Sequence, residues 1–176
     1  SERMSTGVEG LDEMLGGGFY RGSTILVSGT AGTGKSSLAA TFADATCRRG
    51  ERCIYYAFEE STDQIVRNMR SIGVDLGQWL EAGTLRVCAD RPYRYGLEEH
   101  LLRMQRAVRR WDPDTVIVDP LSNLQEMGGF QETKHTLTQL VDFLKSRQTT
   151  ALMTDLNQDG DALEQTNSRI SSLLDS

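Results

Sequence analysis

The octet at residues 29–36 constrains this chain more than any other stretch of its sequence. It reads Gly-Thr-Ala-Gly-Thr-Gly-Lys-Ser and matches the pattern G-x-x-x-x-G-K-[ST] at every required position. Glycines in such a loop let successive backbone N–H groups point at one anion, because no Cβ atom stands in the way. The pattern therefore predicts a site for a nucleoside triphosphate.

The side chains of the octet suit the phosphate groups of such a ligand. Lys35 supplies a mobile positive charge for the β- and γ-phosphates, and the Ser36 hydroxyl suits the Mg²⁺ that accompanies them. A helix that begins here adds the positive end of its dipole. The predicted nucleotide contacts are Thr30, Ala31, Gly32, Thr33, Gly34, Lys35, Ser36 and Ser37.

The residues on both sides of the octet favour a phosphate loop over a glycine turn with an exposed lysine. Residues 24–28 form a β-branched apolar run that predicts a strand. Leu38, Phe42 and Ala45 then recur at helical spacing within residues 37–48. Strand, loop and helix therefore follow in the order that a phosphate loop requires.

Strands and helices alternate along the rest of the chain. Ser61 and Gln64 form a predicted capping box for a helix that buries Ile65, Met69 and Ile72. Further strands are predicted at residues 53–58, 85–89, 115–119 and 149–154, with helices at 8–15, 76–80, 97–111 and 137–144. This order predicts an α/β fold, a mainly parallel sheet with helices on both faces, with ligands beyond the carboxyl ends of its strands.

Several polar residues follow these strands and are therefore expected to face one crevice with the phosphate loop. Asp119 ends an apolar strand. In proteins with such phosphate loops, an acid in this position binds Mg²⁺, usually through a water molecule. The alternative is an acid facing solvent. Thr154 falls at another strand end, and residues 155–167 are predicted to form a polar tail.

Glu59 and Glu60 directly follow the strand predicted at residues 53–58. The like charge of a triphosphate raises the proton affinity of a nearby carboxylate, which suits a general base. Helix-start acids favoured by the dipole are the alternative, especially for Glu60 beside Ser61. We predict Glu59, Glu60 and Lys35 as catalytic residues, with Glu59 the better candidate for the base.

The residues alone leave the attacking group open. Attack by water would make the protein an ATPase, and attack by a protein hydroxyl would make it a kinase. Ser171 and Ser172 are candidate acceptors, although their segment reads equally well as a polar stretch of a terminal helix or strand.

Composition limits the other classes of function. A chain of 176 residues predicts one domain, and no apolar run is long enough to cross a bilayer. A net charge of −6 argues against a broad nucleic-acid surface, and the arginines at 103, 106, 109 and 110 are more typical of a solvated helix face. The N-terminus does not resemble a signal peptide, and three cysteines without C-x-x-C spacing predict reduced, mostly packed thiols in a cytoplasmic protein.

Several motifs together resemble the KaiC family of circadian clock ATPases and autokinases, over nearly the whole chain. They are Ser5-Thr6-Gly7-Val8, Leu11-Asp12-Glu13-Met14, Gly16-Gly17-Gly18-Phe19, the phosphate loop, Phe58-Glu59-Glu60-Ser61 and Ser168-Arg169-Ile170-Ser171-Ser172. The last resembles the acceptor motif of the second, autophosphorylating domain of that family's two RecA-like domains.

The resemblance implies a RecA-like P-loop domain that forms a hexamer with ATP and Mg²⁺ at the subunit interfaces. It implies that Ser171 and Ser172 accept phosphate from a neighbour's ATP, that Glu59 is the base and Glu60 assists, and that Ser36 and Asp119 serve Mg²⁺. Kai-type clock proteins are the implied partners; nucleic acid and membrane are not expected.

Four features depart from the family pattern. Ser172 replaces a threonine, Asn167 replaces an aspartate near the acceptors, and Pro120 stands where serine is frequent. The family also continues beyond Ser176 with further strands and basic residues that reach the neighbour's phosphate. We therefore expect residues 1–176 to form a single domain that is a fragment of a longer, two-domain protein.

Two other functions fit the sequence. A RecA/RadA-like DNA-dependent ATPase would share the loop and the fold, but the acidic balance and the lack of an evident DNA-binding loop argue against it. A signalling scaffold that binds ATP only to hold its ring together is the other alternative.

Overall fold

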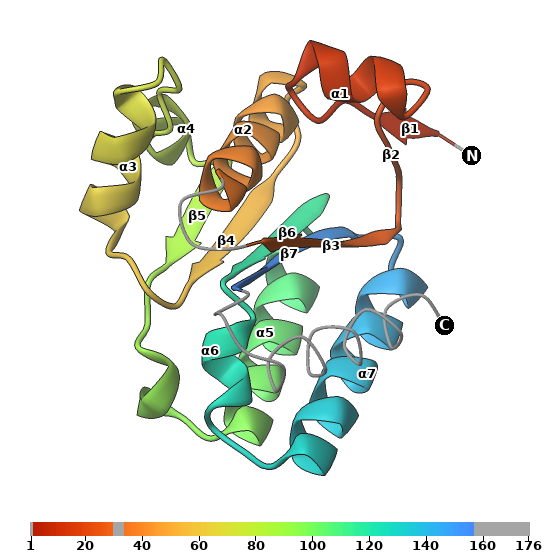
Figure 1. Cartoon of the computed structure of the whole chain (residues 1–176), viewed down its shortest axis with the longest axis vertical. Helices are drawn as coiled ribbons and strands as arrows, with labels where there is room; N and C mark the ends of the chain where they lie inside the picture. The colour runs from red at the N-terminus through yellow and green to blue at the C-terminus, as the bar shows by residue number, and fades with distance from the viewer. Residues whose placement is uncertain (1, 30–33, 157–176) are drawn as a thin grey trace.

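Five parallel strands form the central sheet in the computed structural model, which describes residues 2–29 and 34–156 (Figure 1). The strand order is β3-β7-β6-β4-β5. The RecA-like α/β fold predicted from the sequence is therefore confirmed, with β3 and β5 at the two edges. The strands are β3 (Thr24–Gly29), β4 (Cys53–Ala57), β5 (Leu85–Cys88), β6 (Thr115–Asp119) and β7 (Thr150–Leu156).

Helices cover both faces of the sheet (Figure 1). One face carries α2 (Lys35–Arg48), α3 (Thr62–Arg70) and α4 (Gly77–Ala82), and the other carries α5 (Leu97–Trp111), α6 (Ser122–Gln125) and α7 (Phe130–Ser146). A 3₁₀ turn, η1 (Pro92–Arg94), precedes α5. In the described part of the chain, none of the helices has the length and apolar character needed to cross a bilayer.

Alternation along β4 divides the core between these two layers. Ile54 and Tyr56 pack with α5 and α7, whereas Cys53 and Tyr55 pack with α2 and α3. Successive strand residues point to opposite faces, so a strand covered on both sides must be apolar throughout. Every residue of β4 is accordingly buried, and the end of the strand emerges between the two layers.

A small two-stranded sheet, which we call the N-terminal hairpin although a helix connects its strands, is formed by the first residues of the chain. β1 (Arg3–Met4) pairs antiparallel with β2 (Phe19–Tyr20), and α1 (Glu9–Met14) lies between them in the sequence. Gly18 has a φ of +115°, and a Cβ atom there would lie 1.9 Å from the Met4 carbonyl oxygen. Only glycine allows the hairpin to close this tightly.

Some sequence expectations are confirmed and others are wrong. The capping box of Ser61 and Gln64 is present, but Ile72 is 55% exposed rather than buried. The reason is that α3 ends at Arg70, so helical spacing no longer applies to Ile72. The helix predicted at residues 8–15 is present as α1, and Val8 is its exposed N-cap.

The last described strand was also predicted too short. β7 begins at Thr150 and continues to Leu156. It extends this far because every residue of β3, up to Gly29, pairs with a residue of β7. Asp155 therefore lies in the sheet and not in a polar tail, and α2 begins at Lys35, directly after the loop.

Candidate functional site

The carboxyl ends of the neighbouring inner strands β6 and β7 meet the start of α2 at the C-terminal end of the sheet. Ser36 Oγ donates a hydrogen bond of 3.2 Å to Asp119 Oδ1, although the two residues lie 83 positions apart. Thr154 Oγ1 donates to the same carboxylate oxygen at 2.6 Å. The structure thus brings Ser36 of the phosphate loop together with Asp119 and Thr154, which the sequence analysis placed at strand ends. With Lys35, these residues form what we call the strand-end site.

Asp119 is held in one orientation by donors on three different elements. Besides Ser36 and Thr154, the Tyr55 hydroxyl donates to Asp119 Oδ2 from β4. Burial, together with the negative charge of Asp119, raises the pKa of Tyr55 well above its usual value. Tyr55 therefore keeps its proton and remains a donor, which leaves Asp119 as the acceptor of all three hydrogen bonds.

Lys35 is the cation of the strand-end site and is only 7% exposed. Its Nζ donates to the Gly29 carbonyl oxygen, across the loop that joins β3 to α2. Burial lowers the pKa of Lys35, while the charges of Asp155, Asp119 and Glu59 act in the opposite direction. The ammonium group thus interacts electrostatically with three acids and donates to one backbone carbonyl, and a phosphate oxygen could take the place of that carbonyl.

The structure describes the end of the loop that adjoins α2. Gly34 is the N-cap of α2 and has a φ of +86°, which favours glycine at this position. Ser37 lies in the first turn of α2. Thr30, Ala31, Gly32 and Thr33 lie outside the described residues, so their predicted phosphate contacts stay predictions.

The two glutamates that follow β4 differ in their surroundings. Asn68 Nδ2 of α3 donates to Glu60 Oε2 at 3.1 Å. Glu59 is exposed, is close enough to Lys35 to affect its pKa, and has no side-chain hydrogen bond to another described residue. Phe58 N donates to the Asp119 carbonyl oxygen at 2.9 Å, which ties this turn to the end of β6. The geometry therefore sets Glu59 apart from Glu60.

The oxygen atoms at the strand-end site fit a Mg²⁺ ion that arrives with a nucleotide. Ser36 offers a hydroxyl and Asp119 a carboxylate, both hard donors of the kind that Mg²⁺ prefers. Within the described ranges, no three His, Cys, Asp or Glu side chains are grouped to hold a metal ion. The remaining ligands would accordingly be phosphate oxygens and water, as is usual for Mg²⁺.

The sequence analysis missed two residues next to this site. Tyr55 was assigned only to a buried strand, yet the hydroxyl of a buried tyrosine needs a partner, and Tyr55 precedes the strand end by two residues. Asp155 was assigned to the polar tail but is fully buried in β7, opposite Ser28 of β3. Its position one residue after Thr154 was the available signal.

The predicted phosphoacceptors cannot be placed in the same way. Ser171 and Ser172, together with Asn167, lie outside the described residues, and their assignment stays a prediction.

Removing the Thr154 hydroxyl should loosen Asp119. Thr154→Val keeps the shape of the buried side chain but removes one donor to a carboxylate, so we expect a loss of about 1 to 3 kcal/mol in unfolding free energy. We also expect ATP hydrolysis to fall about tenfold, as for other residues that orient a ligand of a metal. Denaturant unfolding and phosphate release measure the two effects.

Thr133→Val is the matched control for Thr154→Val. Thr133 is also buried, but its hydroxyl, on α7, has no hydrogen-bond partner among the described residues. Its replacement should leave both quantities unchanged or raise stability slightly. Equal effects of the two variants would contradict the role given to Thr154.

Comparison with known proteins gives a consistent family match. The model of the family described as "ATPase: KaiC" matches residues 4–171. The chain is 51% identical, over 99% of its length, to "Circadian clock protein KaiC2" of Synechocystis sp., and 39% identical over 86% to "Circadian clock protein KaiC3" of the same organism. It is 43% identical over 69% to "Circadian clock oscillator protein KaiC" of Parathermosynechococcus lividus. These matches span 31%, 30% and 23% of the relatives' own lengths.

Proposed function

Because the chain belongs to the KaiC family of ATPases, we propose that it binds ATP with Mg²⁺ at the strand-end site and transfers the γ-phosphoryl group to an attacking oxygen. The observation that carries this proposal is the 3.2 Å hydrogen bond from Ser36 Oγ to Asp119 Oδ1, which joins the phosphate loop to the end of β6. The buried Lys35 beside this pair supplies the charge that a triphosphate requires.

The residues of the strand-end site act mainly by positioning and by neutralising charge, which dominate the catalysis of phosphoryl transfer. Lys35 Nζ leaves the Gly29 carbonyl and donates to the β- and γ-phosphate oxygens. Tyr55 and Thr154 hold the Asp119 carboxylate toward Ser36. Mg²⁺, held by Ser36 and Asp119, would neutralise the charge that develops on the phosphate oxygens.

Glu59 is the proposed general base. Its carboxylate is exposed at the turn after β4 and lies near Lys35, so an oxygen nucleophile entering from solvent can reach it. Glu60 assists from the same turn while its carboxylate accepts the hydrogen bond from Asn68.

We extend the proposal to serine autophosphorylation. The support is sequence resemblance: Ser171 and Ser172 match the acceptor positions of the family's autokinase domain. On this proposal the chains assemble as a hexamer, with each ATP facing the acceptor segment of the neighbouring subunit. The relatives carry names of circadian clock proteins, which supports a clock role with Kai-type partner proteins.

Incubation of the full chain with γ-labelled ATP and Mg²⁺ tests these proposals. We expect free labelled phosphate and, in addition, label retained on the protein. Label retained in wild type and lost in the Ser171→Ala/Ser172→Ala double variant would support the acceptors. Full labelling of the double variant would rule them out.

Other results of the same assay separate the competing functions. Free phosphate without labelled protein would indicate an ATPase alone, and neither product would indicate a scaffold that only binds ATP. Hydrolysis that appears only when single-stranded DNA is added, and that falls steeply with salt, would instead support a DNA-dependent ATPase.

A further inference from the structure

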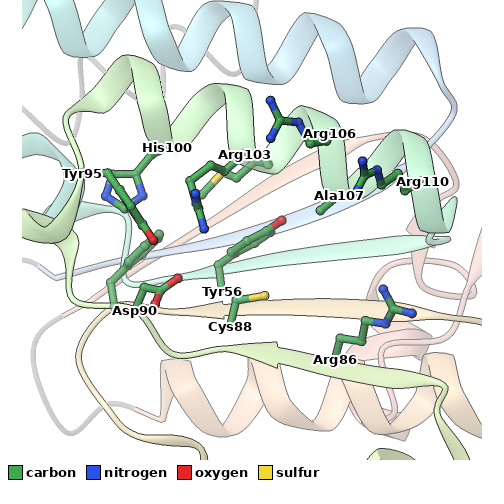
Figure 2. A pocket seen from close by; sticks show the side chains of 12 residues that line it. Tyr56, Arg86, Cys88, Asp90, Tyr95, His100, Arg103, Arg106, Ala107 and Arg110 are labelled. Atoms are coloured by element: carbon green, nitrogen blue, oxygen red, sulfur yellow. The ribbon is translucent and has the colours of Figure 1, made fainter.

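A cavity of about 390 Å³ lies between α5 and the edge of the sheet formed by β4 and β5 (Figure 2). Its lining includes two aromatic residues of the β4 segment, Tyr56 and Phe58, which we call its aromatic floor, and four arginines, at positions 86, 103, 106 and 110. We call it the arginine cavity. It lies on the α5 side of the sheet, whereas Lys35 and Ser36 of the strand-end site begin α2 on the opposite side (Figure 1).

The charge of the arginine cavity is opposite to that of the chain as a whole. The chain has a net charge of −6, yet the cavity lining holds four arginines and one carboxylate, Asp90. That carboxylate already forms an ion pair with Arg94, at 3.3 Å. Such a local excess of positive charge attracts anions.

The arginines fall into two groups by their contacts. Arg86 lies over the Trp111 ring, with its guanidinium carbon 4.2 Å from the ring centre, and Arg103 lies over Tyr95 at the same distance. Arg103 also pairs with Glu99 at 3.6 Å. For Arg106 and Arg110, by contrast, no ion pair with a described carboxylate exists, and both lie one helical turn apart on α5 (Figure 2). Their guanidinium groups can therefore take an anion as a bidentate partner.

The Tyr56 hydroxyl is a buried donor that lacks a partner in the described part of the protein. Tyr56 is only 7% exposed, and Figure 2 shows its hydroxyl directed across the cavity toward α5. Buried hydroxyls are normally hydrogen-bonded, so an unpartnered one beside a cavity points to a ligand or to water. Burial raises the pKa of Tyr56, which keeps the hydroxyl protonated and able to donate to an anion.

We propose that the arginine cavity binds a small molecule with an aromatic ring and a phosphate group, held by Arg106, Arg110 and the Tyr56 hydroxyl. The ring would lie on the aromatic floor, and the guanidinium groups would take the phosphate. A volume of about 390 Å³ is enough for a molecule of this size. This site is separate from the one proposed for ATP.

Titration calorimetry of the full chain with 1-naphthyl phosphate tests this proposal. We expect the Arg106→Ala/Arg110→Ala double variant to bind at least about tenfold more weakly, because two charge-assisted contacts are lost. Both residues are exposed, so the fold should be retained, as circular dichroism can verify. Tyr56→Phe should weaken binding about tenfold without lowering the melting temperature, since the free protein loses no hydrogen bond.

Two control variants locate the binding. Arg109→Ala removes a charge from the same helix, but Arg109 lies over the Phe143 ring of α7, 5.0 Å from its centre, and not in the cavity. The Arg109→Ala variant should bind 1-naphthyl phosphate with the affinity of wild type, and so should the Lys35→Ala variant. Loss of affinity in Lys35→Ala alone would place the probe in the phosphate loop, and equal losses in Arg109→Ala and the double variant would indicate non-specific charge attraction. Either result would overturn the proposal.

Three other probes test the chemistry of the ligand. Inorganic phosphate and 1-naphthol should each bind at least about tenfold more weakly than 1-naphthyl phosphate, because each lacks half of the contacts. A short single-stranded oligonucleotide that binds tightly, with the same dependence on Arg106 and Arg110 while 1-naphthyl phosphate does not bind, would show a nucleic-acid surface. That result would overturn the proposed small ligand.

Discussion

Replacing Lys35 with alanine is expected to abolish detectable ATP hydrolysis by the full chain, with a loss of at least about 10² to 10³-fold. Lys35 is the one basic residue among the four that we grouped as the strand-end site. Its charge is needed where negative charge accumulates during transfer of the γ-phosphoryl group. Nucleotide affinity should fall as well, because the ammonium also contacts the ground-state phosphates. Phosphate release and equilibrium titration with an ATP analogue measure the two quantities.

Lys134→Ala is the control for Lys35→Ala. Lys134 is exposed on α7 and also carries one positive charge, so its removal should change neither hydrolysis nor affinity. Because Lys35 lies near Asp155 and Asp119, its loss should also lower the melting temperature. The assays are therefore run well below that temperature. Wild-type hydrolysis by a folded Lys35→Ala variant would contradict the proposed site.

Replacing Glu59 with glutamine is expected to lower hydrolysis by about 10² to 10⁴-fold, the usual contribution of a general base. Nucleotide affinity should change little, because the amide keeps the size of the side chain and Lys35 still holds the phosphates. Glu60→Gln should cost less, since Glu60 is held by Asn68 and only assists. Single-turnover measurements separate binding from chemistry for both variants. A larger loss in Glu60→Gln than in Glu59→Gln would reverse the assignment.

The arrangement of the site could be predicted from the sequence because the carboxyl ends of parallel strands all lie at the same end of the sheet. The phosphate-loop pattern fixes the place of Lys35 and Ser36, and an apolar strand that ends in Asp119 brings its carboxylate to the same edge. The alternation of strands and helices along the chain predicts the fold, because such an order is typical of a parallel sheet covered by helices. Local pattern and global topology agree here, which is typical of sequences that specify one structure.

The features that were not predicted depend on contacts between distant segments. β7 extends to Leu156 only because β3 offers a partner as far as Gly29, and this places Asp155 in the core. Tyr55 reaches Asp119 across neighbouring strands, which no local pattern in β4 reports.

The basic strip on α5 shows the same limit. The arginines at 103, 106, 109 and 110 are all exposed, as the predicted solvated helix face requires. Their spacing did not show that packing against the sheet divides them into two groups. Arg106 and Arg110 line a cavity, while Arg109 lies over Phe143 of α7. The position of a helix over a sheet edge cannot be read from its own periodicity.

A crystal structure of the full chain with Mg²⁺ and a non-hydrolysable ATP analogue tests the central claim most directly. We predict that Lys35 Nζ leaves the Gly29 carbonyl for the β- and γ-phosphates, that the metal lies between Ser36 and Asp119, and that the γ-phosphate faces Glu59. A nucleotide bound elsewhere, with Lys35 still on the Gly29 carbonyl, would contradict it.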